Sequence, residues 1–288
     1  MKNPTQLHLM LRLGQRLNLN QSRMKLLAFD TSTDLISIAV TRPVDGVARV
    51  WQHSSAGGAL ASSTLIPAIE ALMAQAGLRY DELDAIAFGQ GPGSFTGLRT
   101  ACAVAQGLAF GAGCKVLPVD TLLAVAEQAR FEHLGEAASC HVLALLDARM
   151  DELYAAHYEF KSGAWTQTED YQLIKPENLV LLGSQALAGN VFAAYGDRLP
   201  VPPGLPRLEA LPSAAALLRL APALLASGHA VAPELALPRY IRDKVAKTTV
   251  ERAAEKSAVI PETTSVTSAP TPVIPASTPV IPAKAGIQ

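Results

Sequence analysis

Apolar and polar positions in the first half of the chain follow strand-like and helix-like patterns in turn. Residues 25–30 form an apolar run that ends in an acid, and residues 35–40 form a second run after a polar turn. Short apolar runs bounded by turn residues are typical of buried strands, whereas apolar residues spaced three and four apart indicate helices. The same patterns predict further strands at 47–52, 84–88 and 115–119 and helices at 59–76, 98–110 and 121–130.

The second half of the chain repeats this design. Residues 141–147 again form an apolar run that ends in an acid, so Asp30 and Asp147 would be equivalent. Two consecutive β-β-β-α-β-α units predict a duplicated α/β fold with a cleft between its halves. The elements predicted after residue 147 are strands at 153–160 and 165–174, a helix start at 176–182, a strand at 191–195 and a helix at 213–226 capped by Ser213.

Both ends of the chain depart from these patterns. Residues 1–23 lack the uninterrupted apolar core and the small-residue cleavage site of a secretory signal, so we expect translation to begin at Met24 or this extension to be disordered. Residues 246–288 contain six prolines and no aromatic residue, and such a segment cannot bury enough apolar surface to fold. The predicted organisation is an extension at 1–23, lobes at 24–130 and 131–245, and a disordered tail rich in Pro and Thr at 246–288.

Composition argues against several classes of function. Charged residues make up 17% of the chain and the formal net charge is -1, which gives no overall attraction to nucleic acid or to an anionic membrane. The longest apolar stretch, residues 214–232, is interrupted by Arg219, Pro222 and Gly228 and is too broken to span a bilayer. The three cysteines form no C-x-x-C pair and no two of the six histidines lie four residues apart, so we expect a reducing cytoplasm and no metal site.

A glycine-rich segment at residues 89–97 is the sharpest motif, and it lies between a predicted strand and a predicted helix. Amides at a helix N-terminus can hold a phosphate, and glycines let the backbone approach it closely. The segment has neither the lysine of a Walker loop nor the spacing of a dinucleotide-binding fingerprint, so spacing alone favours a tight turn capped by Ser94 or Thr96. The phosphate-binding alternative would use Asp30, Thr31, Gly91, Gly93, Ser94, Thr96 and Gly97.

Small residues crowd the helix predicted at 98–110, where Ala, Cys and Gly recur. A helix with such a face lets another helix approach closely. From the residues alone, that second helix can belong to the same chain or to a partner.

These motifs together resemble the TsaB (YeaZ) family of bacterial tRNA threonylcarbamoyladenosine biosynthesis. The resemblance spans residues 24–246 and is carried by the segments LLAFDTSTDLISIAV, LIPAIEAL, AIAFGQGPGSFTGLRTACAVAQGLAFG, VDTL, LLDARMDELYAAHYEF and LPRYIRDKVA. It implies an actin-like fold of the sugar kinase and Hsp70 class, which agrees with the duplicated unit. It also implies a non-catalytic subunit that binds and activates its paralogue TsaD, the enzyme that transfers threonylcarbamoyl to an adenosine in tRNA, together with the ATPase TsaE.

The same resemblance implies where the partner binds. In the family, two helices of the first lobe contact TsaD and support a homodimer when TsaD is absent, and they match the helices predicted at 59–76 and 98–110. The catalytic paralogue carries two metal-binding histidines on the first of these helices, and residues 59–76 have none. We therefore expect no catalytic residue, metal or cofactor in this chain, with ATP or ADP at the interface of the complex as an alternative, and only indirect contact with tRNA. The implied interface residues are Leu65, Ile69, Leu72, Leu98, Ala101, Val104, Ala105 and Leu108.

A stand-alone enzyme of the same fold is the competing hypothesis. An ATP-dependent phosphotransferase or hydrolase would use Asp30, Asp147 and the loop at 91–97 around nucleotide and Mg²⁺. Nucleotide turnover by the isolated chain would favour this enzyme over an accessory subunit.

Overall fold

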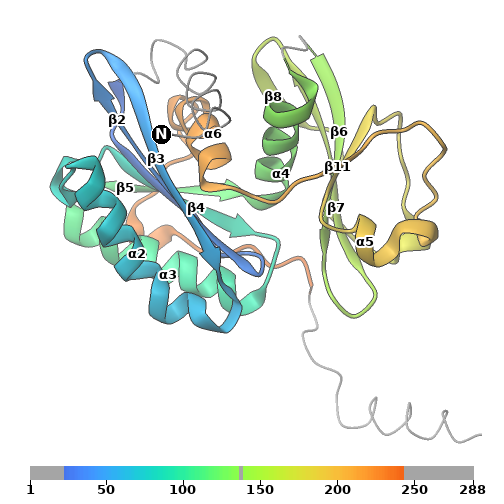
Figure 1. Ribbon diagram of the computed structural model, residues 1–288, viewed down its shortest axis with the longest axis horizontal. Helices are drawn as coiled ribbons and strands as arrows, with labels where there is room; N and C mark the ends of the chain where they lie inside the picture. The colour runs from blue at the N-terminus through green and yellow to red at the C-terminus, as the bar shows by residue number, and fades with distance from the viewer. Residues whose placement is uncertain (1–22, 136–138, 243–288) are drawn as a thin grey trace, which may run out of the picture. The chain divides into compact units, whose positions relative to one another are not determined.

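The computed structural model describes residues 23–135 and 139–242. Residues 1–22 of the expected extension and the whole of the expected tail at 246–288 lie outside the described residues. The described part contains two β-sheets with helices packed on their faces (Figure 1).

The first sheet has the strand order β3-β2-β1-β4-β5. Strand β2 pairs antiparallel with β1 and with β3, whereas β4 pairs in parallel with β1 and with β5 on the other side of the sheet. The parallel part is buried by helices, as parallel sheets require. The strands are β1 Leu26–Asp30, β2 Leu35–Val44, β3 Val47–Ala56, β4 Ala85–Gly91 and β5 Lys115–Asp120.

The second sheet repeats this topology, with the order β8-β7-β6-β10-β11. Strand β6 takes the place of β1, because it pairs antiparallel with the next strand on one side and parallel with a later strand on the other. The duplicated, actin-like α/β fold is therefore confirmed. The strands are β6 Ser139–Asp147, β7 Leu153–Lys161, β8 Ala164–Gln167, β9 Gln172–Ile174, which also pairs with β7, β10 Ala186–Gly189 and β11 Arg207–Glu209.

Two helices pack on a different sheet from the one that their order in the chain suggests. Helices α2 and α3 pack on one face of the first sheet, and α6, which comes last in the described chain, packs on its other face. Helix α4 ends the first unit in sequence but packs on the second sheet, and α4 and α6 contact each other between the sheets (Figure 1). The α-helices are α2 Ala61–Ala76, α3 Phe95–Ala112, α4 Thr121–Ala129, α5 Phe192–Tyr195 and α6 Ala214–Ala226.

Several short helical turns complete the described chain. A π-helical turn, η4 at Arg130–Leu134, continues α4. The remaining turns are the 3₁₀ helices η2 Gly58–Leu60, η3 Tyr80–Glu82, η5 Pro176–Asn178, η6 Gly196–Arg198 and η7 Pro233–Leu235.

Serine side chains cap the N-termini of α3 and α6. The Ser94 hydroxyl accepts a hydrogen bond from the amide of Gly97 at 3.5 Å, so Ser94 rather than Thr96 is the N-cap of α3. Ser213 caps α6 in the same way through the amide of Ala216, as predicted. Such caps satisfy amides that the helix itself leaves without a partner.

The hydrophobic core is divided by the sheets. Phe29 and Phe88 of the first sheet are fully buried against α2 and α3, and Leu117 faces α6 on the opposite side. A third cluster between α4 and the second sheet includes Val125 and Leu146. Each sheet thus buries two faces, which explains the nearly continuous apolar runs of β1 and β6.

The predictions for the second lobe contain errors, whereas all predicted elements of the first lobe are present. The strand predicted at 191–195 is wrong, because Phe192–Tyr195 forms helix α5 and the strand β10 lies earlier, at Ala186–Gly189. The single strand predicted at 165–174 is two strands, β8 and β9. The helix start predicted at 176–182 is limited to a 3₁₀ turn, and β11 was not predicted. Strand β10 was missed because it is short and three of its four residues are Ala or Gly, which carry no strand propensity.

No helix in the ranges 23–135 and 139–242 combines the length and the apolar character needed to cross a membrane.

Candidate functional site

The eight residues implied as a partner interface lie on the inward side of α2 and α3. Val104 and Leu108 are partly buried against the core beneath the first sheet, and the other six side chains are at most 3% exposed. Leu98 excepted, those six belong to the core cluster shared with Phe29 and Phe88. The six buried side chains are not available to a second protein, because they hold the helices on their own sheet, whereas contact of Val104 and Leu108 with a partner stays a prediction. The six are Leu65, Ile69, Leu72, Leu98, Ala101 and Ala105.

The outward side of the same helices has a different composition. Phe110 of α3 is 82% exposed, and Ala103 and Gly107 lie three to seven residues before it, on the same face of the helix. A Cβ atom built on Gly107 would meet no atom within 4 Å, so this face is open. Ile66 of α2 is 41% exposed and Leu60, just before α2, is 58% exposed. The sequence contained a signal for this open face, because Phe110 does not fit the spacing of the apolar residues that α3 buries.

The glycine-rich loop between β4 and α3 packs against the turn that follows β1. The amide of Ser94 donates to the carbonyl of Ser32 at 2.7 Å, and the Thr31 hydroxyl donates to the carbonyl of Gly97 at 2.7 Å. A Cβ atom at Gly97 would overlap the Thr31 carbonyl, and one at Gly93 would lie 2.6 Å from the Ser32 carbonyl. Both glycines are thus required by contacts between two backbone segments of this chain.

The other loop residues are also placed by the chain itself. Gly91 has a φ of +123°, and a Cβ atom there would lie 2.5 Å from the carbonyl of Arg239. Thr31 is buried, whereas Thr96 is exposed and its carbonyl accepts the hydroxyl of Thr100 at 3.0 Å. The structure therefore brings the predicted phosphate-loop residues together, but fills the space between them with their own backbone.

Asp30, at the end of β1, is fully enclosed by this packing. Its Oδ1 accepts the amide of Ser32 at 2.9 Å and the hydroxyl of Ser32 at 2.7 Å. Its Oδ2 lies over Gly89 and has no hydrogen-bond donor among the described residues. Burial raises the pKa of this carboxyl to about 6, against the opposing effect of the two Ser32 bonds.

Asp147, at the equivalent end of β6, is less buried and is bound by a backbone amide and by two side chains. Its Oδ1 accepts the amide of Arg149 at 2.8 Å and the hydroxyl of Tyr195 at 2.9 Å. The Arg149 guanidinium lies 3.3 Å from Asp147 Oδ2 and 2.6 Å from Asp34 Oδ2 in the turn after β1. This arginine thus connects the two equivalent turns. No group of three or more metal-ligating side chains occurs within the part of the chain that the structure describes.

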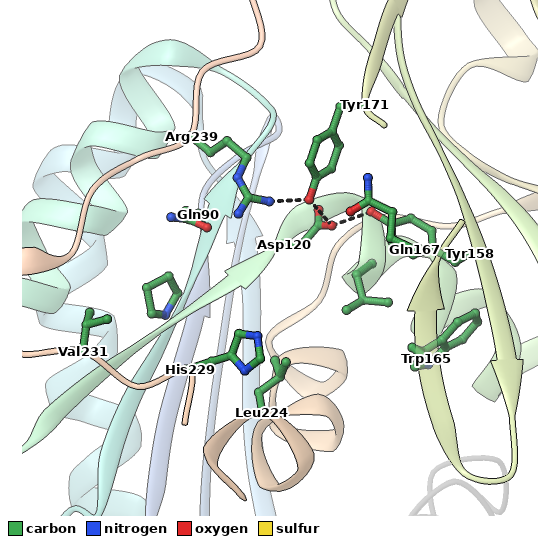
Figure 2. Close-up of a pocket in the computed structure, with 12 residues that line it drawn as sticks. Gln90, Asp120, Tyr158, Trp165, Gln167, Tyr171, Leu224, His229, Val231 and Arg239 are labelled. Atoms are coloured by element: carbon green, nitrogen blue, oxygen red, sulfur yellow. Dashed lines mark hydrogen bonds between the residues drawn. The ribbon is translucent and has the colours of Figure 1, made fainter. Parts of the chain in front are cut away.

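A buried polar network that was not predicted as a site links the lobes at the end of β5. Asp120 caps α4 through the amide of Leu122 at 2.9 Å, and its Oδ2 accepts the hydroxyls of Tyr158 and Tyr171 from the second lobe. The Tyr171 oxygen also accepts a hydrogen bond from Arg239 (Figure 2). Burial raises the pKa of Asp120 above its usual range, although both tyrosines and Arg239 act in the opposite direction.

The sequence signal for this network was an acid at a strand end directly before a helix. In the sequence, the segment Val119–Leu122 supports the family resemblance but does not by itself indicate a polar network. The tyrosines could not be assigned to Asp120, because they lie 38 and 51 residues further along the chain.

Comparisons with known proteins converge on one family. A family model described as TsaD: tRNA N6-adenosine threonylcarbamoyltransferase matches residues 58–261. The tRNA threonylcarbamoyladenosine biosynthesis protein TsaB of Escherichia coli (strain K12) is 34% identical over 232 residues, which cover 77% of this chain and 96% of that protein. The TsaB protein of Haemophilus influenzae is 32% identical over 238 residues, covering 77% of this chain and 95% of that protein.

A solved structure gives the same result. YeaZ from Pseudomonas aeruginosa superposes with a TM-score of 0.67 at 37% identity, covering 76% of this chain and 100% of that chain. This chain therefore covers the whole of that solved structure.

Proposed function

Because this chain belongs to the TsaB family of tRNA threonylcarbamoyladenosine biosynthesis proteins, we propose that it is the non-catalytic subunit that binds and activates the TsaD transferase. TsaD docks on the outward face of α2 and α3. The ATPase TsaE joins this pair, and tRNA is contacted through the complex rather than by this chain alone. In the absence of TsaD, the same face supports a homodimer.

The observation that carries this proposal is the open apolar face around Phe110. Burying an exposed aromatic ring contributes about 1.5–3 kcal/mol, and aromatic anchors at the centre of an interface often dominate its binding energy. Ala103 and Gly107 beside the ring allow a partner helix to approach the backbone of α3 closely. Ile66 of α2, the helix that contacts α3, is a second exposed apolar side chain on these helices.

The non-catalytic role is supported by the contacts that the residues of the predicted nucleotide site make within this chain. The glycines contact the backbone of residues 31 and 32, and Asp147 accepts bonds from Arg149 and Tyr195. A phosphotransferase would need these groups for nucleotide and Mg²⁺. ATP or ADP, if it acts in the complex, would bind at the interface with TsaD.

The proposal is tested with Phe110→Asp, because an exposed position can take a charge without disturbing the fold. Val180→Asp in the second lobe is the matched control, since Val180 is also exposed, at 51%. Each variant is mixed with TsaD for size-exclusion chromatography and added to a reconstituted modification reaction with TsaD, TsaE and the enzyme that forms the threonylcarbamoyl adenylate. Modified adenosine is measured by nucleoside mass analysis.

We expect Phe110→Asp to lose co-elution with TsaD and to lower product at least tenfold, because it places an unpaired charge in an apolar interface. Val180→Asp should behave as the unmodified chain. Equal product in reactions without this chain would contradict the accessory role. Nucleotide turnover by the isolated chain would favour the phosphotransferase instead.

A further inference from the structure

A cavity of about 390 Å³ lies between the lobes and has no role in the function proposed above. Its walls come from β4, β5 and the end of α6 on one side and from β7 and β8 on the other (Figure 2). The volume lies within the range of small-molecule sites. The lining mixes apolar side chains with at least as many polar ones, and the polar ones are Gln90, Asp120, Tyr158, Gln167, Tyr171, His229 and Arg239.

Arg239 supplies a positively charged group in this cavity. Its amide donates to the carbonyl of Gln90 at 2.8 Å, and its guanidinium lies 5.0 Å from the centre of the Tyr171 ring and donates one bond to the Tyr171 hydroxyl. Within residues 23–135 and 139–242, no carboxylate lies at ion-pair distance from it. A guanidinium has five N–H donors, so most of them remain available to a ligand.

The charge of Arg239 is balanced through Tyr171 by Asp120. Both oxygens of the Asp120 carboxylate already accept bonds, from Leu122 on one side and from the two tyrosines on the other. Asp120 therefore offsets the positive charge without being open to a ligand itself. A ligand with no net charge suits this pair better than an anion does, since burying an uncompensated charge is costly.

Two amide oxygens add acceptors. The side-chain N–H group of Gln90 donates a hydrogen bond to the Leu237 carbonyl at 3.0 Å, and that of Gln167 donates to the Glu169 carbonyl at 2.8 Å. Figure 2 shows that the oxygen of each amide is turned toward the Asp120 and Tyr171 network. The cavity thus presents cationic donors next to neutral acceptors.

We propose that this cavity binds a free α-amino acid in its zwitterionic form. The carboxylate is held by the Arg239 guanidinium, and the ammonium group donates to the side-chain oxygen of Gln167. The amino acid side chain lies against Leu123, Leu224 and Trp165, so an aliphatic or aromatic residue is preferred. A zwitterion has no net charge, and it matches both the donors and the acceptors of the site.

The first experiment titrates the isolated full chain with each proteinogenic L-amino acid in a calorimeter. L-leucine is then compared with isocaproate, which lacks the ammonium group, and with isopentylamine, which lacks the carboxylate. We expect saturable binding of one or more apolar amino acids, leucine among them, and at least about tenfold weaker binding of both analogues, because each loses a charge-assisted hydrogen bond. No saturable heat with any amino acid, or equal binding of isocaproate and leucine, would overturn the proposal.

The second experiment assigns the binding to this cavity. Arg239→Gln and Gln167→Leu should each weaken binding by about tenfold; Gln167 is exposed, so its variant folds even if Arg239→Gln does not. Gln52→Leu, on an exposed position of β3 outside the cavity lining, is the control and should bind as the unmodified chain. Unchanged binding by Gln167→Leu, or equal weakening by Gln52→Leu, would contradict a site in this cavity.

Discussion

The turn after β1 and the turn after β6 occupy equivalent positions in the two lobes, yet they are built in different ways. The first is closed by the glycine-rich loop, which buries Asp30 to 1% exposure. The second is open to solvent and is held by an ion pair between Arg149 and Asp147. Duplication has kept the topology and the acid at the strand end. Burial and charge, which determine what each acid can do, have diverged.

The largest effect is expected where the first turn contacts the glycine-rich loop. Gly97→Ala places a methyl group onto the Thr31 carbonyl, and backbone atoms cannot rotate away as a flexible side chain can. We expect a loss of about 3 kcal/mol in the free energy of unfolding, measured by denaturant titration. Gly107→Ala in the same helix is the control; it meets open space and should stabilise the chain by up to about 1 kcal/mol. Equal effects of the two substitutions would show that the loop is not tightly packed.

The next effect concerns the pH dependence that burial gives to Asp30. Its pKa is raised from 3.8 to about 6 in the folded chain, so the folded state binds the proton more tightly than the unfolded state. The stability contribution of this proton is complete below about pH 4 and is lost as the pH rises through about 6. At about 1.4 kcal/mol per pKa unit, the loss amounts to about 3 kcal/mol.

Asp30→Asn tests this dependence because it removes the titrating group and keeps the oxygen that binds Ser32. The difference in unfolding free energy between Asp30→Asn and the unmodified chain should shift in favour of the variant between about pH 4 and pH 7. It is measured by chemical denaturation at a series of pH values. A constant difference across this range would mean that Asp30 is not desolvated in the folded chain.

The same contrast between lobes explains how much of the fold could be predicted from the sequence. The strands around Asp30 are long apolar runs with clear turn residues, and they were placed correctly. Three of the four residues of strand β10 are Ala or Gly, and pairing with β6 rather than propensity makes the strand. The crossed packing of α4 and α6 was equally hidden, because an apolar helical stripe does not say which sheet it covers.

The candidate sites show where local patterns fail in another way. Helical spacing identified the apolar residues of α2 and α3 but could not tell the face that packs on the chain's own sheet from the face open to solvent, and the packed face includes Leu65 and Ala105. Phe110 indicates the open face, because it is apolar but lies outside the stripe of residues that α3 buries. The network of Asp120, Tyr158 and Tyr171 depends on contacts between lobes, and no local spacing encodes them.

The smallest effect is expected at the ion pair that joins the two turns. The side chains of Arg149 and Asp34 are 69% and 79% exposed, so solvent screens their attraction despite a distance of 2.6 Å. Arg149→Ala, Asp34→Ala and the double variant form a cycle whose coupling energy we expect to be below about 1 kcal/mol and to fall further at high salt. The measurement is chemical denaturation at low and high ionic strength. A coupling energy of several kcal/mol would contradict this, because it would mean that the exposed turn after β6, rather than the buried hydrogen bonds of Asp120, holds the lobes together. The turns after β1 and β6 would then differ in solvent exposure but not in how strongly they stabilise the fold.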